Sequence, residues 1–229
     1  MDRPGGLSHS WGMAEPSTFE FHTERHLVVL TGITARNLEG LLDGIEKVPG
    51  SSIFYHTHQE YLAHHFEKPV FYNDFALWIA EALQQDALAE RLAAIDLLSF
   101  TAIRGLRDEI AATIRSYIAG GAEGTRDCPP GNEFHFCRSK SFVMPTGIVA
   151  RTPAEFFEKL PQVTTVSLYF HFFEARLRLG HITNDFSQWL GDQGEEELAQ
   201  RINALDPYIR SLDELKADII ALGALRKWQ

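Results

Sequence analysis

FEFHTERHLVVLTGITARNLEGLL, residues 19–42, has a counterpart later in the chain, FHFCRSKSFVMPTGIVARTPAEFF at residues 134–157. A shift of 115 residues aligns the two without a gap as far as His56 and His171, and 11 of these 38 positions are identical. Self-similarity at a fixed period is the sequence signature of a duplicated architecture. The pair of stretches therefore predicts that the chain is built twice on one pattern.

Two further motifs recur in the same order. NDFALW at residues 73–78 corresponds to NDFSQW at residues 184–189, and LAERLAAID at 88–96 corresponds to LAQRINALD at 198–206. Between the two copies lies the Gly- and Pro-rich AGGAEGTRDCPPGNE, which is typical of a linker. We predict a flexible leader (1–18), a helical repeat (19–118), a linker (119–133) and a second helical repeat (134–226).

Each repeat begins with F-x-F and a β-branched run, which indicates a short extended or strand element. Helix start signals follow: Asn37, Asn73 and Asn184 stand at N-cap positions, and residues 152–155 (TPAE) and 211–214 (SLDE) match capping boxes. The histidine-rich segment predicts a helix that starts at Ser51 or Ser52. We predict a mainly α fold of two tandem pseudo-symmetric repeats, each of about five helices with a short strand element.

Charge and composition exclude several classes of protein. The net charge is −10 and the pI about 5.4, whereas nucleic-acid grooves and anionic membrane surfaces attract clusters of Lys and Arg. No apolar run is long enough to span a bilayer, and the N-terminus lacks the apolar core of a signal peptide. Two cysteines do not make a disulfide framework. We therefore expect a cytoplasmic protein with no nucleic-acid or membrane partner.

A histidine cluster, SSIFYHTHQEYLAHHFEK at residues 51–68, suggests a metal site. On a helical wheel of 100° per residue, His56, Glu60 and His64 share one face, and these residue types suit Zn²⁺ or Fe²⁺. The second copy has Ala175 and Leu179 at the last two positions, so a site common to both copies is excluded. No metal or other cofactor is predicted, and a site in the first copy alone stays open as an alternative.

Polar residues that both copies retain are the better candidates for a binding site. They are Arg36 and Arg151, His56 and His171, and Asp74 and Asp185. In one interpretation His and Asp form an acid–base pair, and Arg holds an anionic or sugar-phosphate group. In the other, the polar residues cap helices and the histidines are hydrogen-bonded inside the core.

The motifs SIFYHTH, NDFALW and LAERLAAID, followed by SLYFHFFEARLRLG, NDFSQW and LAQRINALD, resemble an uncharacterised prokaryotic domain-of-unknown-function family with two tandem copies of FxF…H…NDFxxW…LAxRL. The resemblance covers nearly the whole chain after the leader. Members of this family are often encoded near glycosyltransferases or trehalose and glycogen enzymes, so it implies a bacterial protein linked to carbohydrate metabolism. It implies no catalytic residues.

Three hypotheses about function follow. The first is an accessory or regulatory protein that binds a partner enzyme, of the glycosyltransferase type, or a small sugar ligand. The second is an enzyme that acts on a sugar or sugar phosphate through His56, Asp74 and Arg36 or their counterparts. The third is a metal-dependent enzyme centred on His56, Glu60 and His64.

Overall fold

A computed structural model of the chain describes residues 18–59, 71, 73–175, 177, 180, 183–206, 210–226 and 228. The predicted leader, except for residue 18, lies outside the described residues. So do Glu60 and His64, two of the three residues of the candidate metal site.

Helices make up most of the described residues, which confirms a mainly α fold. The N-terminal bundle contains α1 (Leu38–Lys47), α2 (Gly50–Phe54), the π-helix η1 (Tyr55–Gln59), α4 (Asp74–Leu83), α5 (Asp86–Ala93), the 3₁₀ turn η2 (Leu97–Ser99) and α6 (Ile103–Ala119). The C-terminal bundle contains α7 (Pro153–Lys159), the 3₁₀ turn η3 (Leu160–Gln162), α8 (Thr165–Tyr169), the π-helix η4 (Phe170–Glu174), α10 (Asp185–Asp192), α11 (Glu196–Asn203) and α12 (Leu212–Ala224). None of the described helices is long and apolar enough to cross a membrane.

The N-cap predictions are largely confirmed. Asn73 and Asn184 accept hydrogen bonds from the backbone N–H three residues on, which begins α4 and α10. Ser211 forms a reciprocal capping box with Glu214 at the start of α12. The predicted start of the histidine helix is wrong, because α2 begins at Gly50 after Pro49. The segment then becomes π-helical, so a wheel of 100° per residue does not describe it.

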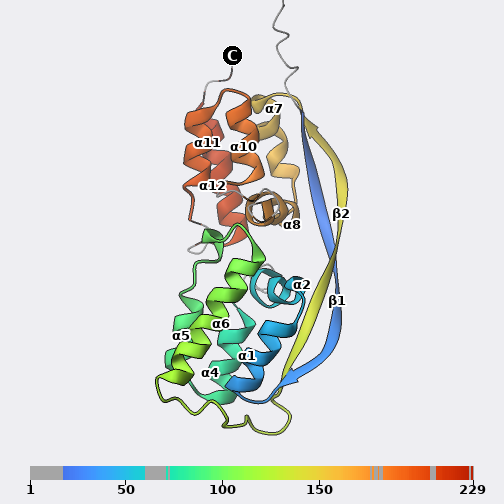
Figure 1. Cartoon of the computed structure of the whole chain (residues 1–229). Coiled ribbons are helices and arrows are strands. Elements are labelled where there is room, and N and C mark those ends of the chain that lie inside the picture. Colours follow the sequence, from blue (N-terminus) through green and yellow to red (C-terminus); the bar gives the residue numbers. More distant parts are fainter. Residues whose placement is uncertain are drawn as a thin grey trace, which may run out of the picture.

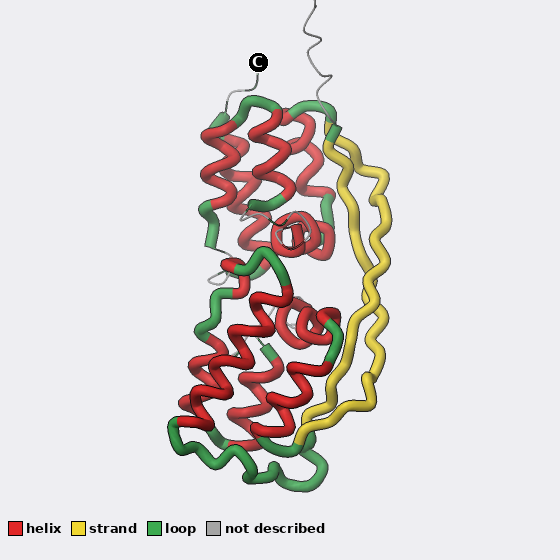
Figure 2. Tube along the Cα trace, in the orientation of Figure 1, coloured by secondary structure: helices red, strands yellow, loops and turns green. Residues whose placement is uncertain are grey.

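The two strands pair with each other along the side of both bundles. β1 (Phe19–Ala35) and β2 (Phe134–Ala150) form a two-stranded antiparallel sheet, the ribbon. Figure 1 shows the two helical bundles stacked end to end, with the ribbon running past both. The prediction of a short strand element is wrong: each strand has 17 residues, because each continues past its own bundle to reach the other. Figure 2 shows this as two long yellow tubes.

A bulge near each end of the ribbon contains the repeated Thr-Gly-Ile. Residues 31–33 lie opposite Phe136, and residues 146–148 lie opposite Phe21. Gly32 and Gly147 both have φ of +80°, which glycine adopts without the steric cost that a Cβ brings. The hydroxyls of Thr31 and Thr146 donate to the carbonyls of Phe136 and Phe21. The motif is thus a strand irregularity, and it faces the phenylalanines that enter the core.

Each strand contributes its F-x-F to the core of the other bundle. Phe19 and Phe21 of β1 pack among buried residues of α7, α8, η4 and α10. Phe134 and Phe136 of β2 pack among buried residues of α1, α4 and α6. Each core therefore contains residues from both sides of the predicted linker at residues 119–133, and the ribbon joins the two bundles.

Candidate functional site

Polar side chains from α2, η1 and α4 form a hydrogen-bonded set that binds the backbone of β2. Ser52 donates its hydroxyl to the carbonyl of Cys137 at 2.5 Å, and the N–H of Cys137 donates to Nε2 of His56 at 2.9 Å. Nδ1 of His56 lies 2.7 Å from Oδ2 of Asp74, which is in the first turn of α4. We call Ser52, His56 and Asp74 the first clamp, because together they bind both polar backbone groups of one strand residue.

A second clamp, formed by Ser167, His171 and Asp185, grips β1 in the same way. Ser167 donates to the carbonyl of His22 at 2.5 Å, and the N–H of His22 donates to Nε2 of His171 at 2.8 Å. Nδ1 of His171 lies 2.7 Å from Asp185. The clamped residues, Cys137 and His22, occupy matching places in the 115-residue alignment.

The partners of each ring fix its protonation state. A backbone N–H can only donate, so Nε2 of His56 and of His171 must carry a lone pair. The proton of the neutral imidazole is then on Nδ1 and is donated to the aspartate. Both ring nitrogens are engaged, and both histidines are buried. An acid–base reaction at Nε2 would require the strand to leave first.

Aromatic side chains surround the histidine ring of each clamp. The ring of His56 lies 4.7 Å from that of Phe134, measured between centroids, and 5.4 Å from that of Phe75. His171 has the corresponding neighbours, Phe19 at 5.0 Å and Phe186 at 5.6 Å. The apolar walls keep water away, which strengthens the hydrogen bonds that the rings make.

The structure brings together some of the predicted site residues and separates others. Nδ1 of His56 lies 2.7 Å from Asp74, and Nδ1 of His171 lies 2.7 Å from Asp185, a contact that both interpretations of the sequence allow. The ion pairs of Arg36 go instead to Asp127 and Glu133, at 3.7 and 3.9 Å. Arg151 is exposed, and its backbone N–H donates to Glu155.

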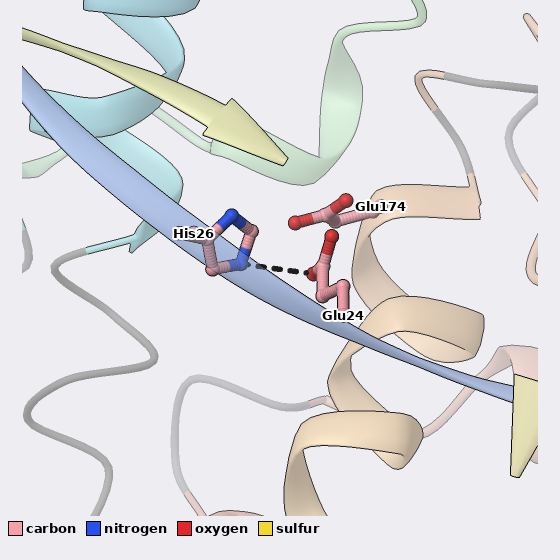
Figure 3. Close-up of side chains that lie close together, drawn as sticks. All are labelled: Glu24, His26 and Glu174. Carbon is pink, nitrogen blue, oxygen red and sulfur yellow. Dashed lines mark ion pairs between the residues drawn. The ribbon is translucent and has the colours of Figure 1, made fainter. Parts of the chain in front are cut away.

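A different group of side chains has the composition of a metal site. Of the sequence candidate, His56 is engaged in the first clamp, and Glu60 and His64 lie outside the described residues. Glu24 and His26 of β1 instead lie beside Glu174 of η4 (Figure 3), with one ligand atom from each residue within 4.8 Å of the others.

The clamp serines are functional candidates that the sequence did not predict. So is the group of Glu24, His26 and Glu174, which we call the cluster. A signal existed for the serines: both copies carry S-x₃-H, Ser52 with His56 and Ser167 with His171. No comparable signal existed for the cluster, because Glu24 and Glu174 are far apart in the chain. The second copy has Ser139 and Ser141 where the first has Glu24 and His26.

His58 is a buried histidine with a packing role. Its ring stacks on Phe54 at 5.2 Å, and Nδ1 lies 2.9 Å from the hydroxyl of Thr57. The matching pair in the second copy is Tyr169 and Phe173, stacked at 4.9 Å. Desolvation by burial lowers the pKa of His58 to about 4.

We expect His58 to make the protein less stable in acid. Between pH 6.5 and about 4 the unfolded chain binds a proton at His58 that the folded chain does not, so stability falls as the pH falls. The loss between about pH 7 and pH 5 is roughly 2 kcal/mol. His58→Phe, which copies Phe173, should remove that part of the pH dependence. Urea unfolding of both proteins at each pH measures it, and equal pH slopes would contradict it.

A groove on the N-terminal bundle contains cationic side chains. It has a volume of about 740 Å³ and lies between the α1–α2 connection and α6. Arg104, Arg107 and Arg115 line it together with the carboxylates of Glu46 and Asp108. Arg115 donates to Glu46, and Arg107 donates to the carbonyl of Val48. Its size suits a small ligand, and the arginines favour an anionic one.

Comparison with known proteins places these features in a family. A solved structure, that of OrfY from Thermoproteus tenax, is similar with a TM-score of 0.78 and 30% sequence identity, over 91% of this chain and 95% of that chain. A search of curated proteins finds no match. The model of the family of unknown function DUF5752 matches residues 16–223. That match includes the ribbon, both clamps and the cluster, so the chain belongs to the DUF5752 family of unknown function.

Proposed function

We propose that the protein is an accessory protein that binds a partner protein on the outer face of its ribbon. The observation that carries this proposal is a group of large apolar side chains exposed in the middle of the ribbon, among them Leu27 and Phe142, 55% and 47% exposed. Large apolar side chains that are exposed on one face of a folded protein often mark an interaction site.

The register of the ribbon identifies which residues share the outer face. Side chains alternate between the two faces of a strand, and directly paired residues lie on the same face. Glu24 and His26 face the helix η4, so Arg25 and Leu27 face outward, as do their partners Phe142 and Lys140. We call the following six residues the outer ribbon face: Arg25, Leu27, Arg138, Lys140, Phe142 and Met144.

The charge of this face indicates the chemistry of the partner. The chain has a net charge of −10, yet the outer ribbon face carries Arg25, Arg138 and Lys140 and no carboxylate. Nζ of Lys140 lies 5.3 Å from the centre of the Phe142 ring. A protein segment with acidic and apolar side chains would complement this face, since opposite charges steer association and apolar contacts hold the complex.

Correspondence between the bundles supports the proposed tandem duplication. Both clamps, both bulges and both strands occupy matching positions. The strand register also agrees, because Arg25 pairs with Phe142 and Leu27 pairs with Lys140, a set that a shift of 115 residues maps onto itself. Under this proposal the two clamps fix the ribbon at Cys137 and His22, and the part of the ribbon between these residues binds the partner.

The identity of the partner is proposed from the sequence resemblance. We infer a glycosyltransferase-type enzyme of carbohydrate metabolism in a bacterial cytoplasm. A sugar or sugar-phosphate ligand is the second proposal for binding. The groove supports it because Arg104 lines it beside Arg107 and Arg115, and guanidinium groups suit a phosphate. The enzyme hypothesis through His56, Asp74 and Arg36 has less support, since His56 holds a strand and Arg36 pairs elsewhere.

We expect the double variant Leu27→Asp and Phe142→Asp to lose partner capture. Both side chains are exposed, so the fold should survive, whereas two carboxylates on the apolar face should weaken binding at least about 100-fold. The measurement is co-purification from native cell extract with tagged wild type and variant, followed by affinity measurement on any protein that wild type enriches.

Leu225→Asp is the matched control, because Leu225 is an exposed apolar residue outside the ribbon, at 71% exposure. It should capture the partner like wild type. Capture that survives in the double variant, or is lost in the control, overturns the proposal. A dimer of wild type that the double variant abolishes would show that the face binds a second copy instead.

A further inference from the structure

We propose that Glu24, His26 and Glu174 bind one divalent transition-metal ion, with Zn²⁺ as the best fit. Two carboxylates and an imidazole converge where the ribbon passes over the π-helix η4 (Figure 3). This site is separate from the outer ribbon face, and the proposal does not depend on partner binding.

The spacing of the ligand atoms suits one ion. One donor atom of each residue lies within 4.8 Å of the other two, and Nε2 of His26 is 3.3 Å from Oε1 of Glu24. Zinc bonds of about 2.0–2.2 Å place two ligands of one ion up to roughly 4 Å apart. Small side-chain rotations would complete such a site without moving the backbone.

The second observation is the burial of Glu24, whose carboxylate accepts no hydrogen bond from the part of the chain that the structure describes. Its side chain is fully buried, and among the described residues neither carboxylate oxygen has a hydrogen-bond donor. A second carboxylate, that of Glu174, is also buried close by. Buried carboxylates are strongly disfavoured unless a cation or a proton compensates them. A divalent cation bound here would compensate the buried charge of Glu24.

His26 is already oriented for a metal bond through Nε2. Its Nδ1 lies 2.9 Å from the hydroxyl of Ser141, its direct partner across the ribbon. Donation from Nδ1–H to that hydroxyl leaves the lone pair on Nε2, which is the nitrogen that faces Glu24. Metal-bound histidines commonly have such a hydrogen bond on the other ring nitrogen, which fixes the tautomer.

The second clamp sets the distance between the two carboxylates. It binds His22 to His171, and Glu24 lies two residues beyond His22 on β1. Glu174 lies three residues beyond His171 within the π-helix η4. Both acids therefore stand at fixed offsets from one hydrogen bond. π-helical turns are often associated with functional sites, because they redirect side chains out of the α-helical pattern.

The donor set favours zinc over harder ions. An imidazole suits Zn²⁺, Fe²⁺ and similar ions, whereas Mg²⁺ and Ca²⁺ prefer oxygen ligands alone. Zinc also binds more tightly than Mn²⁺ or Fe²⁺ to a given site. Three protein ligands leave a coordination position for water or another small ligand.

Metal titration of chelator-stripped protein tests the proposal. We expect wild type to bind one equivalent of Zn²⁺ by calorimetry, to melt at a higher temperature with Zn²⁺, and to give a visible d–d absorption with Co²⁺. Glu24→Gln should weaken Zn²⁺ binding at least about 100-fold and abolish the thermal shift. Ser141→Ala, which removes the shorter of the two hydrogen bonds at Nδ1 of His26, should weaken it up to about 10-fold.

Two controls separate this site from surface binding, because the chain has ten histidines. Glu20→Gln changes an exposed carboxylate on the same strand, and His135→Ala removes an exposed imidazole on the other. Both should bind Zn²⁺ like wild type. Thermal melting of metal-free Glu24→Gln checks that it folds. The proposal is overturned if wild type binds no equivalent, or if folded Glu24→Gln binds it equally well.

Discussion

Phe136→Ala is expected to lower the free energy of unfolding by about 3–5 kcal/mol, the range for removing a fully buried aromatic ring. Phe136 has no exposed surface and packs between Phe134 and the helices of the N-terminal bundle. It lies so close to α1 that a Cβ on Gly44 would come within 2.3 Å of its ring. The helix backbone cannot readily move into the space left by the ring, so a cavity should remain.

Phe142→Ala is the matched control, since it makes the same change in the same strand at a half-exposed position. It should cost less than about 1 kcal/mol. Urea unfolding of both variants, followed by far-ultraviolet circular dichroism, measures the difference. Similar losses for the two variants would mean that β2 does not anchor in the N-terminal core through Phe136.

His56→Leu is expected to cost about 3 kcal/mol of unfolding free energy. The change keeps most of the side-chain volume but removes the acceptor for the N–H of Cys137 and the donor for Asp74. A polar group left unsatisfied in a part-buried site costs about 1–3 kcal/mol, and lost packing on Phe134 adds to it. Amide hydrogen exchange should also become faster at Cys137.

Asp74→Asn is the control for the role of charge at the first clamp. The asparagine oxygen can still accept from Nδ1–H of His56, so the neutral ring keeps both hydrogen bonds. The variant should lose only the favourable charge at the start of α4, about 0.5–1 kcal/mol. If Asp74→Asn costs as much as His56→Leu, the ring carries a positive charge in the folded protein, and the assigned tautomer is wrong.

Local signals in the sequence predicted much of the secondary structure correctly. The N-caps at Asn37, Asn73 and Asn184 and the capping box at Ser211 are confirmed, because a cap depends only on residues within one turn. The partnership of His56 with Asp74 was one of two interpretations, and it occurs inside the core that the other interpretation expected.

Long-range placement decided the rest. The sequence places Phe134 and Phe136 in a strand element, but packing on either bundle would bury them equally well, so the pattern cannot say which bundle they enter. The role of His56 depends on a backbone N–H that lies 81 residues away. Glu24 and Glu174 meet only because the second clamp joins their segments. The sequence alone determined most of the helices and their caps, since these follow from neighbouring residues. Only the tertiary structure decided that each strand packs into the core of the other bundle, and only it formed the clamps and the cluster. These features require contacts that no local pattern encodes.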